Sequence, residues 1–173
     1  MVRMSTGSKS KQDYGTPEDF IRAVQRHVGK IGFDLAASAH NKKHARYYAM
    51  LDLLEPDWGA MGFDSLAQDW GIAPMARATG EKVLWLNPPF KQITPWARKC
   101  AETLPDLGSD LIAFLVPAAV GSNWFRDYVY GKAAVLFLNG RIKFEGSTDP
   151  FPKDLMLCVY GWKPGCHIWQ WWK

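Results

Sequence analysis

Apolar residues near the start of the chain recur at helical spacing. In "F-I-R-A-V-Q-R-H-V", from Phe20, they lie every three or four positions, and Gly29 closes the pattern. Thr16 is in position to cap this segment, Pro17 suits the first helical position, and two acids, beginning with Glu18, favour the positive end of a helix dipole. We therefore predict a helix that begins beside Thr16 and ends before Gly29.

The rest of the chain contains short, continuous apolar runs separated by amphipathic segments. The predicted strands are 31–38, 82–86, 110–117, 133–138 and 154–162, and the predicted helices are 94–104 and 122–131. This alternation indicates an α/β fold of the Rossmann-like class, with a mostly parallel twisted sheet and helices on both faces. No helix separates the last strand from the tail "H-I-W-Q-W-W". We therefore also predict an antiparallel hairpin at one edge of the sheet.

The segment from residue 39 to residue 80 is polar and irregular. It gives weak signals for two short helices, near residues 41–50 and 64–69. Long irregular segments in compact domains are uncommon and are usually functional. We expect this one to contact a ligand or a substrate.

Length and charge set the domain organisation. The 173 residues suit one catalytic domain, which we place at 13–173. Residues 1–12 contain Arg3, Lys9 and Lys11 without an acid and are expected to form a disordered basic arm. This arm is either a solubilising tail or a phosphate-binding segment. The net charge of +4 is mild support for a polyanionic partner.

Composition also argues against several classes of protein. No apolar run is long enough to span a membrane, and the first residues lack the apolar centre of a signal peptide, so a cytoplasmic location is expected. Three cysteines without a C-x-x-C pair do not suggest a disulfide framework. We expect no metal, because two short pairs have no second pair at ligand spacing. These pairs are His40 with His44, and Cys166 with His167.

The most specific chemical signal is "V-L-W-L-N-P-P-F", residues 83–90, where an apolar strand ends in an amide, two prolines and an aromatic ring. The side-chain oxygen of Asn87 and the carbonyl of Pro88 could each accept an N–H from an exocyclic amine. Pro89 stiffens the turn, and Phe90 offers a face on which a base can stack. A simple turn that ends the strand is the alternative.

This segment resembles the [D/N/S]-P-P-[Y/F/W] motif of amino-methyltransferases that use S-adenosylmethionine. Over residues 13–162 the chain more specifically resembles the phage and prophage, Dam-like DNA N6-adenine methyltransferase family. The matching segments are "Y-G-T-P", "F-D-L-A-A-S-A-H-N-K-K", "D-S-L-A-Q-D-W", "W-L-N-P-P-F" and "N-G-R-I-K-F". The resemblance implies adenine N6 methylation of DNA, with Asn87, Pro88, Pro89 and Phe90 as the catalytic segment.

The resemblance also implies which residues bind S-adenosylmethionine. They are Asn87, Tyr14, Thr16 and Pro17, Asp34 with Ala36, Ala37 and Ser38, and Asp64 with Ser65. The "A-A-S" turn departs from the glycine-rich loop of the wider class, because alanine and serine do not adopt positive φ as freely as glycine. Two of these residues have structural alternatives. Asp34 could be an aspartate that caps a helix or lies at the edge of the core, and Asp64 could cap a helix.

Two basic groups are candidates for contact with DNA phosphates. They are Lys42, Lys43 and Arg46 in the irregular segment, and Arg141 and Lys143 in "G-R-I-K-F". The second pair alternates and could lie on one face of a strand, which could equally be a solvated face. The tryptophans of the tail are expected to pack in the fold or in a subunit contact, and the oligomeric state is left open.

The expected reaction is direct methyl transfer to an adenine that is flipped out of the duplex, since N6 is inaccessible inside it. Two alternatives remain open. One is a methyltransferase acting on another amine, in RNA or on a protein glutamine. The other is a DNA-binding homologue that has lost catalysis. The chain has little room for a separate recognition domain, so loops 39–63 and 145–154 are expected to read the target with relaxed specificity.

Overall fold

The computed structural model describes residues 15–49, 57–71 and 80–173 of the chain. The predicted basic arm at 1–12 and Tyr14 lie outside these residues. Parts of the irregular segment, 50–56 and 72–79, lie outside them as well.

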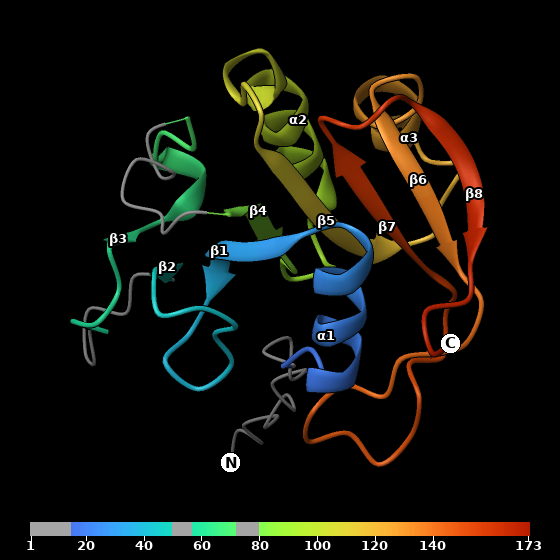
Figure 1. Ribbon diagram of the computed structural model, residues 1–173, viewed down its shortest axis with the longest axis horizontal. Helices are drawn as coiled ribbons and strands as arrows, with labels where there is room; N and C mark the ends of the chain where they lie inside the picture. Colours follow the sequence, from blue (N-terminus) through green and yellow to red (C-terminus); the bar gives the residue numbers. More distant parts are fainter. Residues whose placement is uncertain (1–14, 50–56, 72–79) are drawn as a thin grey trace, which may run out of the picture.

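An eight-stranded sheet with the order β3-β2-β1-β4-β5-β7-β6-β8 forms the centre of the structure (Figure 1). Its strands are β1 (Lys30–Ala37), β2 (Tyr47–Ala49), β3 (Gly62–Phe63), β4 (Glu81–Leu86), β5 (Leu111–Pro117), β6 (Ala133–Leu138), β7 (Leu155–Tyr160) and β8 (Gly165–Trp169). All neighbouring pairs are parallel except those of β7, which runs antiparallel to both β5 and β6. The predicted fold class is confirmed, including an antiparallel pair near one edge.

Helices cover both faces of the sheet, as predicted. They are α1 (Glu18–His27), α2 (Ile93–Thr103) and α3 (Asn123–Tyr128), with short 3-10 turns at Ser65–Ala67 and Leu104–Asp106. Side chains of β4 alternate between two cores, because successive residues of a strand point to opposite faces. Trp85 packs with Phe20 and Val24 of α1, whereas Leu84 and Leu86 pack on the side of α2 and α3. No helix of the described residues has the length and apolarity needed to cross a bilayer.

Two predicted elements differ from the structure. The predicted helix near 41–50 is wrong, because Tyr47–Ala49 forms β2, where the buried aromatic side chains of Tyr47 and Tyr48 favour an extended backbone. The tail pairs with β6 instead of the strand before it, so the edge strand β8 is parallel to β6. Trp169 and Trp171 pack against Phe20 of α1, with ring centroids 5.8 and 5.2 Å away. The packing role predicted for these two tryptophans is confirmed.

The order of the strands creates one position suited to a ligand. From β1 the chain moves outward to β2 and β3 and then returns to β4 on the other side of β1. Ligands of such sheets bind where the order reverses, beyond the carboxyl ends of the strands. Figure 1 shows three connections at this edge: the loop after β1, the segment before α1, and the loop after β6.

Gly161 follows β7 at the start of the turn toward β8, where its backbone conformation is important for stability. Its φ is +94°, and an added Cβ would lie 2.8 Å from the backbone oxygen of Asp110. Gly161→Ala should lower the free energy of unfolding by about 2 to 4 kcal/mol, through overpacking and backbone strain. Gly131→Ala is the matched control, because Gly131 has a φ of +72° and nothing within 4 Å of an added Cβ.

Chemical denaturation of both variants measures this difference. The control should lose only about 1 kcal/mol, the cost of an alanine at positive φ. Equal losses in the two variants would contradict the role given to the close approach of Asp110.

Candidate active site

Asn87 leaves the carboxyl end of β4 and makes a hydrogen bond with the segment before α1. Its Nδ2 donates to Thr16 Oγ1 at 3.0 Å, and the Thr16 side chain is buried, with 2% of the residue exposed. The prediction that Thr16 caps the helix is wrong, because Pro17 occupies the cap position of α1 without a side-chain bond. The Thr16 hydroxyl instead orients the Asn87 amide. Since an amide is planar, fixing its nitrogen also fixes the direction of its oxygen.

Phe90 belongs to a cluster of three aromatic rings at the same edge. Its ring lies 5.5 Å from that of Phe151 and 6.2 Å from that of Phe144, both in edge-to-face geometry. Both partners come from the loop after β6, so this loop sets the orientation of Phe90. Phe90 also borders a hollow of about 360 Å³ that Lys91 and Trp124 line. Sequence reasoning missed Lys91 and Trp124, although Lys91 directly follows the motif.

Asp34 is buried in β1, and both of its carboxylate oxygens accept hydrogen bonds from the backbone. Its Oδ1 accepts from the Ala36 N–H at 3.2 Å, and its Oδ2 accepts from the Lys43 N–H at 2.9 Å. Burial raises the pKa of Asp34 to about 6, against the opposing effect of these two bonds. The carboxylate therefore holds the loop after β1 in place.

Of the predicted A-A-S turn, only the serine lies in a turn. Ala36 and Ala37 are still part of β1, and the turn starts at Ser38, whose carbonyl accepts from the N–H groups of Asn41 and Lys42. The Ser38 N–H in turn donates to Asn41 Oδ1 at 2.7 Å. The two alanines therefore adopt strand geometry and need no positive φ. This explains how the turn forms without the glycines of the wider class.

Lys43 connects the loop after β1 with the loop after β6. Its Nζ lies 2.8 Å from Glu145 Oε1 and 3.5 Å from Glu18 Oε1, and only 5% of its side chain is exposed. The Glu145 N–H donates to the Gly15 carbonyl at 2.9 Å. A Cβ on Gly15 would lie 2.0 Å from Glu145 Oε2, so a larger residue there would displace the Glu145 carboxylate from this position. Sequence reasoning missed Glu145, although it directly follows "N-G-R-I-K-F".

Asp64 and Ser65 follow β3 at the same edge but have different surroundings. Asp64 is exposed and has a φ of +52°, the only positive value of a non-glycine residue in the described ranges. Such strain is concentrated at functional sites. It precedes a 3-10 turn but makes no side-chain capping bond, so the structure does not support the capping alternative. Ser65 is buried and accepts a hydrogen bond from Trp70 Nε1.

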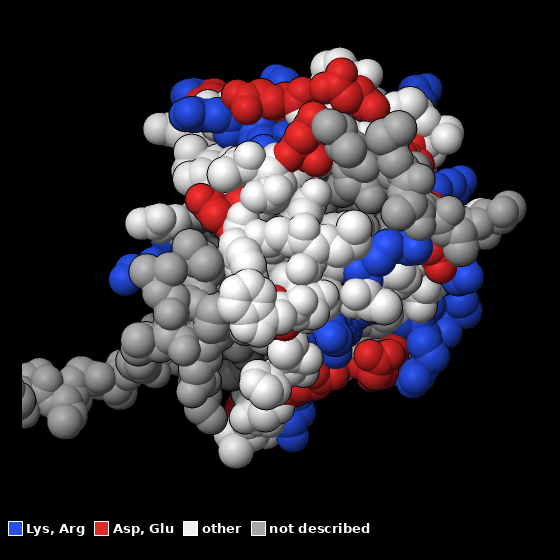
Figure 2. All heavy atoms as spheres, turned by 90° about the vertical axis from the view of Figure 1, so that its left-hand side faces the viewer, with Lys and Arg blue, Asp and Glu red and all other residues white. Residues whose placement is uncertain are grey.

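Of the basic residues predicted to contact DNA, two have carboxylate partners and three are exposed. Arg46 is bound by Glu81 and by the Gly32 carbonyl, and Lys43 is in the ion pairs described above. Lys42 is exposed over the ring of Tyr47. Arg141 and Lys143 are both exposed and alternate with buried residues, but 141–144 is an irregular segment instead of a strand. On the side of β2 and β3, acidic and basic side chains occur together around a largely uncharged centre (Figure 2).

Comparison with known proteins identifies the family. The family model for DNA N-6-adenine-methyltransferase (Dam) matches residues 4–154. The chain belongs to this family. It is also 24% identical over 152 residues to the "DNA N-6-adenine-methyltransferase" of Escherichia phage T1, covering 88% of this chain. The aligned region spans 55% of that relative, so this chain matches only about half of the length of the phage protein.

The raised pKa of Asp34 predicts how stability depends on pH. The pKa of Asp34 in the folded protein is about 6, whereas the ordinary pKa of an aspartate side chain is 3.8, so the folded protein keeps this proton to a higher pH. The group therefore favours folding at low pH, and its contribution of up to about 3 kcal/mol is lost as pH rises through about 6. Relative to the wild type, Asp34→Asn should thus become more stable as the pH rises from about 3.8 to about 6.

Urea denaturation of the two proteins at a series of pH values measures this change. Asp149→Asn, in the exposed loop after β6, is the matched control. A stability difference between wild type and Asp34→Asn that stays constant with pH would contradict the assignment.

Proposed function

We propose that the protein transfers a methyl group from S-adenosylmethionine to N6 of adenine in DNA. One observation carries this proposal: the N-P-P-F segment leaves β4 at the reversal point of the sheet, with the Asn87 amide held by Thr16. Membership of the Dam family supports the same reaction.

Asn87 and Pro88 are suited to hold the exocyclic amine. The amide oxygen of Asn87 and the backbone carbonyl of the buried Pro88 are two hydrogen-bond acceptors on adjacent residues. The proline ring limits how far the two acceptors can move relative to each other. Accepting both N–H groups would direct the nitrogen lone pair toward the methyl donor. Holding the reacting atoms in near-attack geometry lowers the activation free energy, by on the order of 7–11 kcal/mol in well-oriented cases.

The hollow beside Phe90 is a suitable place for the adenine. N6 cannot be reached inside a duplex, so we propose that the adenine is flipped out at a cost of a few kcal/mol. Stacking on an aromatic ring offsets this by about 1–3 kcal/mol per base. Phe90 is held from behind by Phe144 and Phe151. The ring therefore needs little reorganisation when a base arrives.

The carboxyl ends of β1 and β3 fit S-adenosylmethionine. Ala37 and Ser38 are small enough to let a ligand approach the backbone, and the exposed carboxylate of Asp64 can accept from ribose hydroxyls or an amino group. When bound, S-adenosylmethionine would supply an electrophilic methyl group. Asp34 acts on this site through the loop that it holds, since its oxygens already accept two backbone N–H groups.

Exposed cations near the site are suited to the DNA backbone. We propose Arg141, Lys143 and Lys42 for phosphate contacts, since all three are exposed. Lys43 and Arg46 instead stabilise the loop after β1 through their carboxylate partners. Contacts from so few loops favour recognition of a short or relaxed target.

Asn87→Ala tests the proposed reaction. The variant should lose at least about a hundredfold in methyl transfer, the typical cost of removing one oriented polar group from an active site. Its affinity for S-adenosylmethionine, measured by calorimetry, should fall far less than the rate of transfer, because the amide acts chiefly on the amine even if it also borders the cofactor. Asn139→Ala, an exposed asparagine at the same edge, is the control and should stay active.

Transfer from labelled S-adenosylmethionine, with mass spectrometry of the digested DNA, identifies the product. N6-methyladenine formed by the wild type and lost in Asn87→Ala supports the proposal. Label in RNA or in a protein glutamine would instead show that the same motif acts on another amine. Absence of cofactor binding by the wild type would favour a DNA-binding protein without catalysis.

A further inference from the structure

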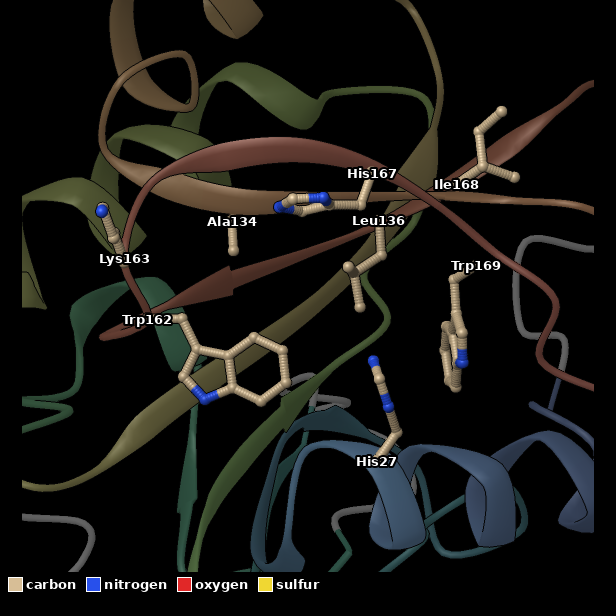
Figure 3. A pocket seen from close by; sticks show the side chains of 8 residues that line it. All are labelled: His27, Ala134, Leu136, Trp162, Lys163, His167, Ile168 and Trp169. Atoms are coloured by element: carbon tan, nitrogen blue, oxygen red, sulfur yellow. The ribbon is translucent and has the colours of Figure 1, made fainter.

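A second hollow lies on the α1 face of the sheet, between the last turn of α1 and β8 (Figure 3). Its volume is about 430 Å³, and Ala134 and Leu136 of β6 form its floor. Side chains of Trp162, His27 and Trp169 come from three different elements and line the same space. This hollow shares no lining residue with the one beside Phe90.

Flat aromatic rings dominate the walls of this hollow. His27 stacks on Trp169 with ring centroids 4.8 Å apart and an interplanar angle of 17°. Trp162 meets His27 edge-on at 5.7 Å and is half-buried, whereas Lys163 beside it is exposed. Aromatic faces next to a cation are the features with which proteins bind bases and phosphates of single strands. An exposed ring system of this kind therefore suits a planar ligand that carries negative charge.

α1 connects this hollow with the active site. The helix starts beside Thr16 and ends at His27, and its ten residues span about 15 Å at 1.5 Å per residue. Arg22 and Arg26 are exposed along it, four positions apart, and so lie on the same face. This length corresponds to about four nucleotides at the 3.4 Å rise per strand of a B-form helix, and to fewer in an extended single strand, whose phosphates lie farther apart. Two exposed arginines are thus available on the helix that connects the active site with the hollow, beyond the acids Glu18 and Asp19 of its first turn.

One wall of the hollow is not part of the region that matches the family. The match ends at residue 154, whereas Trp162, Lys163 and Trp169 lie beyond it. The floor and α1 are within the matched region. The hollow is therefore completed by a C-terminal segment that the family model does not cover.

We propose that this hollow binds an unpaired nucleobase of the substrate DNA strand, at most about four nucleotides from the target adenine. The base would stack on Trp162, with its phosphate near Lys163 and the intervening phosphates along Arg22 and Arg26. The inference rests on the proposed action on DNA. It adds a second anchoring point that would fix the direction of the strand across α1.

Binding of labelled single strands to the full chain tests this inference. A long oligonucleotide carries one central adenine with about eight nucleotides on each side, and a short one carries about one, too few to span the ~15 Å to the hollow even in an extended strand. Trp162→Ala and Lys163→Ala should each weaken binding of the long strand several-fold to about tenfold, and Trp162→Phe should retain most of it. Trp172→Ala is the matched control, because Trp172 is 50% exposed in the same tail but does not line the hollow.

The short strand separates a contact with DNA from a change in the fold. It should bind equally to wild type and to Trp162→Ala. Unchanged affinity of the long strand in both pocket variants would overturn the inference, as would an equal loss for short and long strands. A change in oligomeric state without a change in DNA affinity would show that the hollow is a protein contact.

The proposed function fails separately from this inference. Wild type that binds the long strand but forms no N6-methyladenine contradicts the reaction and leaves the hollow to be judged by its own variants. Wild type that binds no DNA contradicts both.

Discussion

The hydrogen bond from Asn87 to the Thr16 hydroxyl joins two segments that are 71 residues apart in the chain. One segment ends β4, and the other precedes α1. The Asn87 amide is half-buried, and a polar group left unpaired away from water costs about 1–3 kcal/mol. Thr16 supplies a partner for it at the edge where the strand order reverses. The direction of the Asn87 oxygen, on which the proposed chemistry depends, follows from this one bond.

The surrounding loops keep both partners of this bond in position. Lys43 and Glu145 form an ion pair whose lysine is almost fully buried, unlike ordinary surface pairs that contribute little. Glu145 also holds the backbone of Gly15, the residue before Thr16. Asp34 holds the backbone of Lys43. A chain of contacts thus runs from the core of β1 to the Asn87 amide. A substitution that removes one of these contacts is expected to change the orientation of the Asn87 amide, even when the substituted residue does not contact Asn87.

Elements with strong local signals could be predicted from the sequence, whereas contacts between distant segments could not. The buried runs of β4, β5 and β6 are long and bounded by turn residues, so local pattern was sufficient. β2 has three residues, too few to show a period, and its extended backbone depends on pairing with β1. The tail has the apolar pattern of a strand. Which strand it pairs with depends on the turn at Gly161 and on packing against α1, and neither can be read from that pattern.

The site shows the same division. N-P-P-F at a strand end could be recognised locally, and its place at the carboxyl edge is confirmed. Thr16 followed by Pro17 and Glu18 is equally typical of a helix cap, and only the folded chain shows that Asn87 uses its hydroxyl. The roles of Lys43 and Glu145 also depend on tertiary contacts, because they are 102 residues apart. Charge alone does not show which cations are exposed, and only the folded chain shows that Lys43 and Arg46 have carboxylate partners.

A double-mutant cycle on methyl transfer tests most directly whether Thr16 orients Asn87 for the reaction. Thr16→Val alone should slow transfer markedly, and Thr16→Ser should restore most of the rate, because serine keeps the hydroxyl. In the Asn87→Ala background, Thr16→Val should cause almost no additional loss, since residues that act through one bond are not additive. Independent, additive losses from the two substitutions would contradict the proposed coupling.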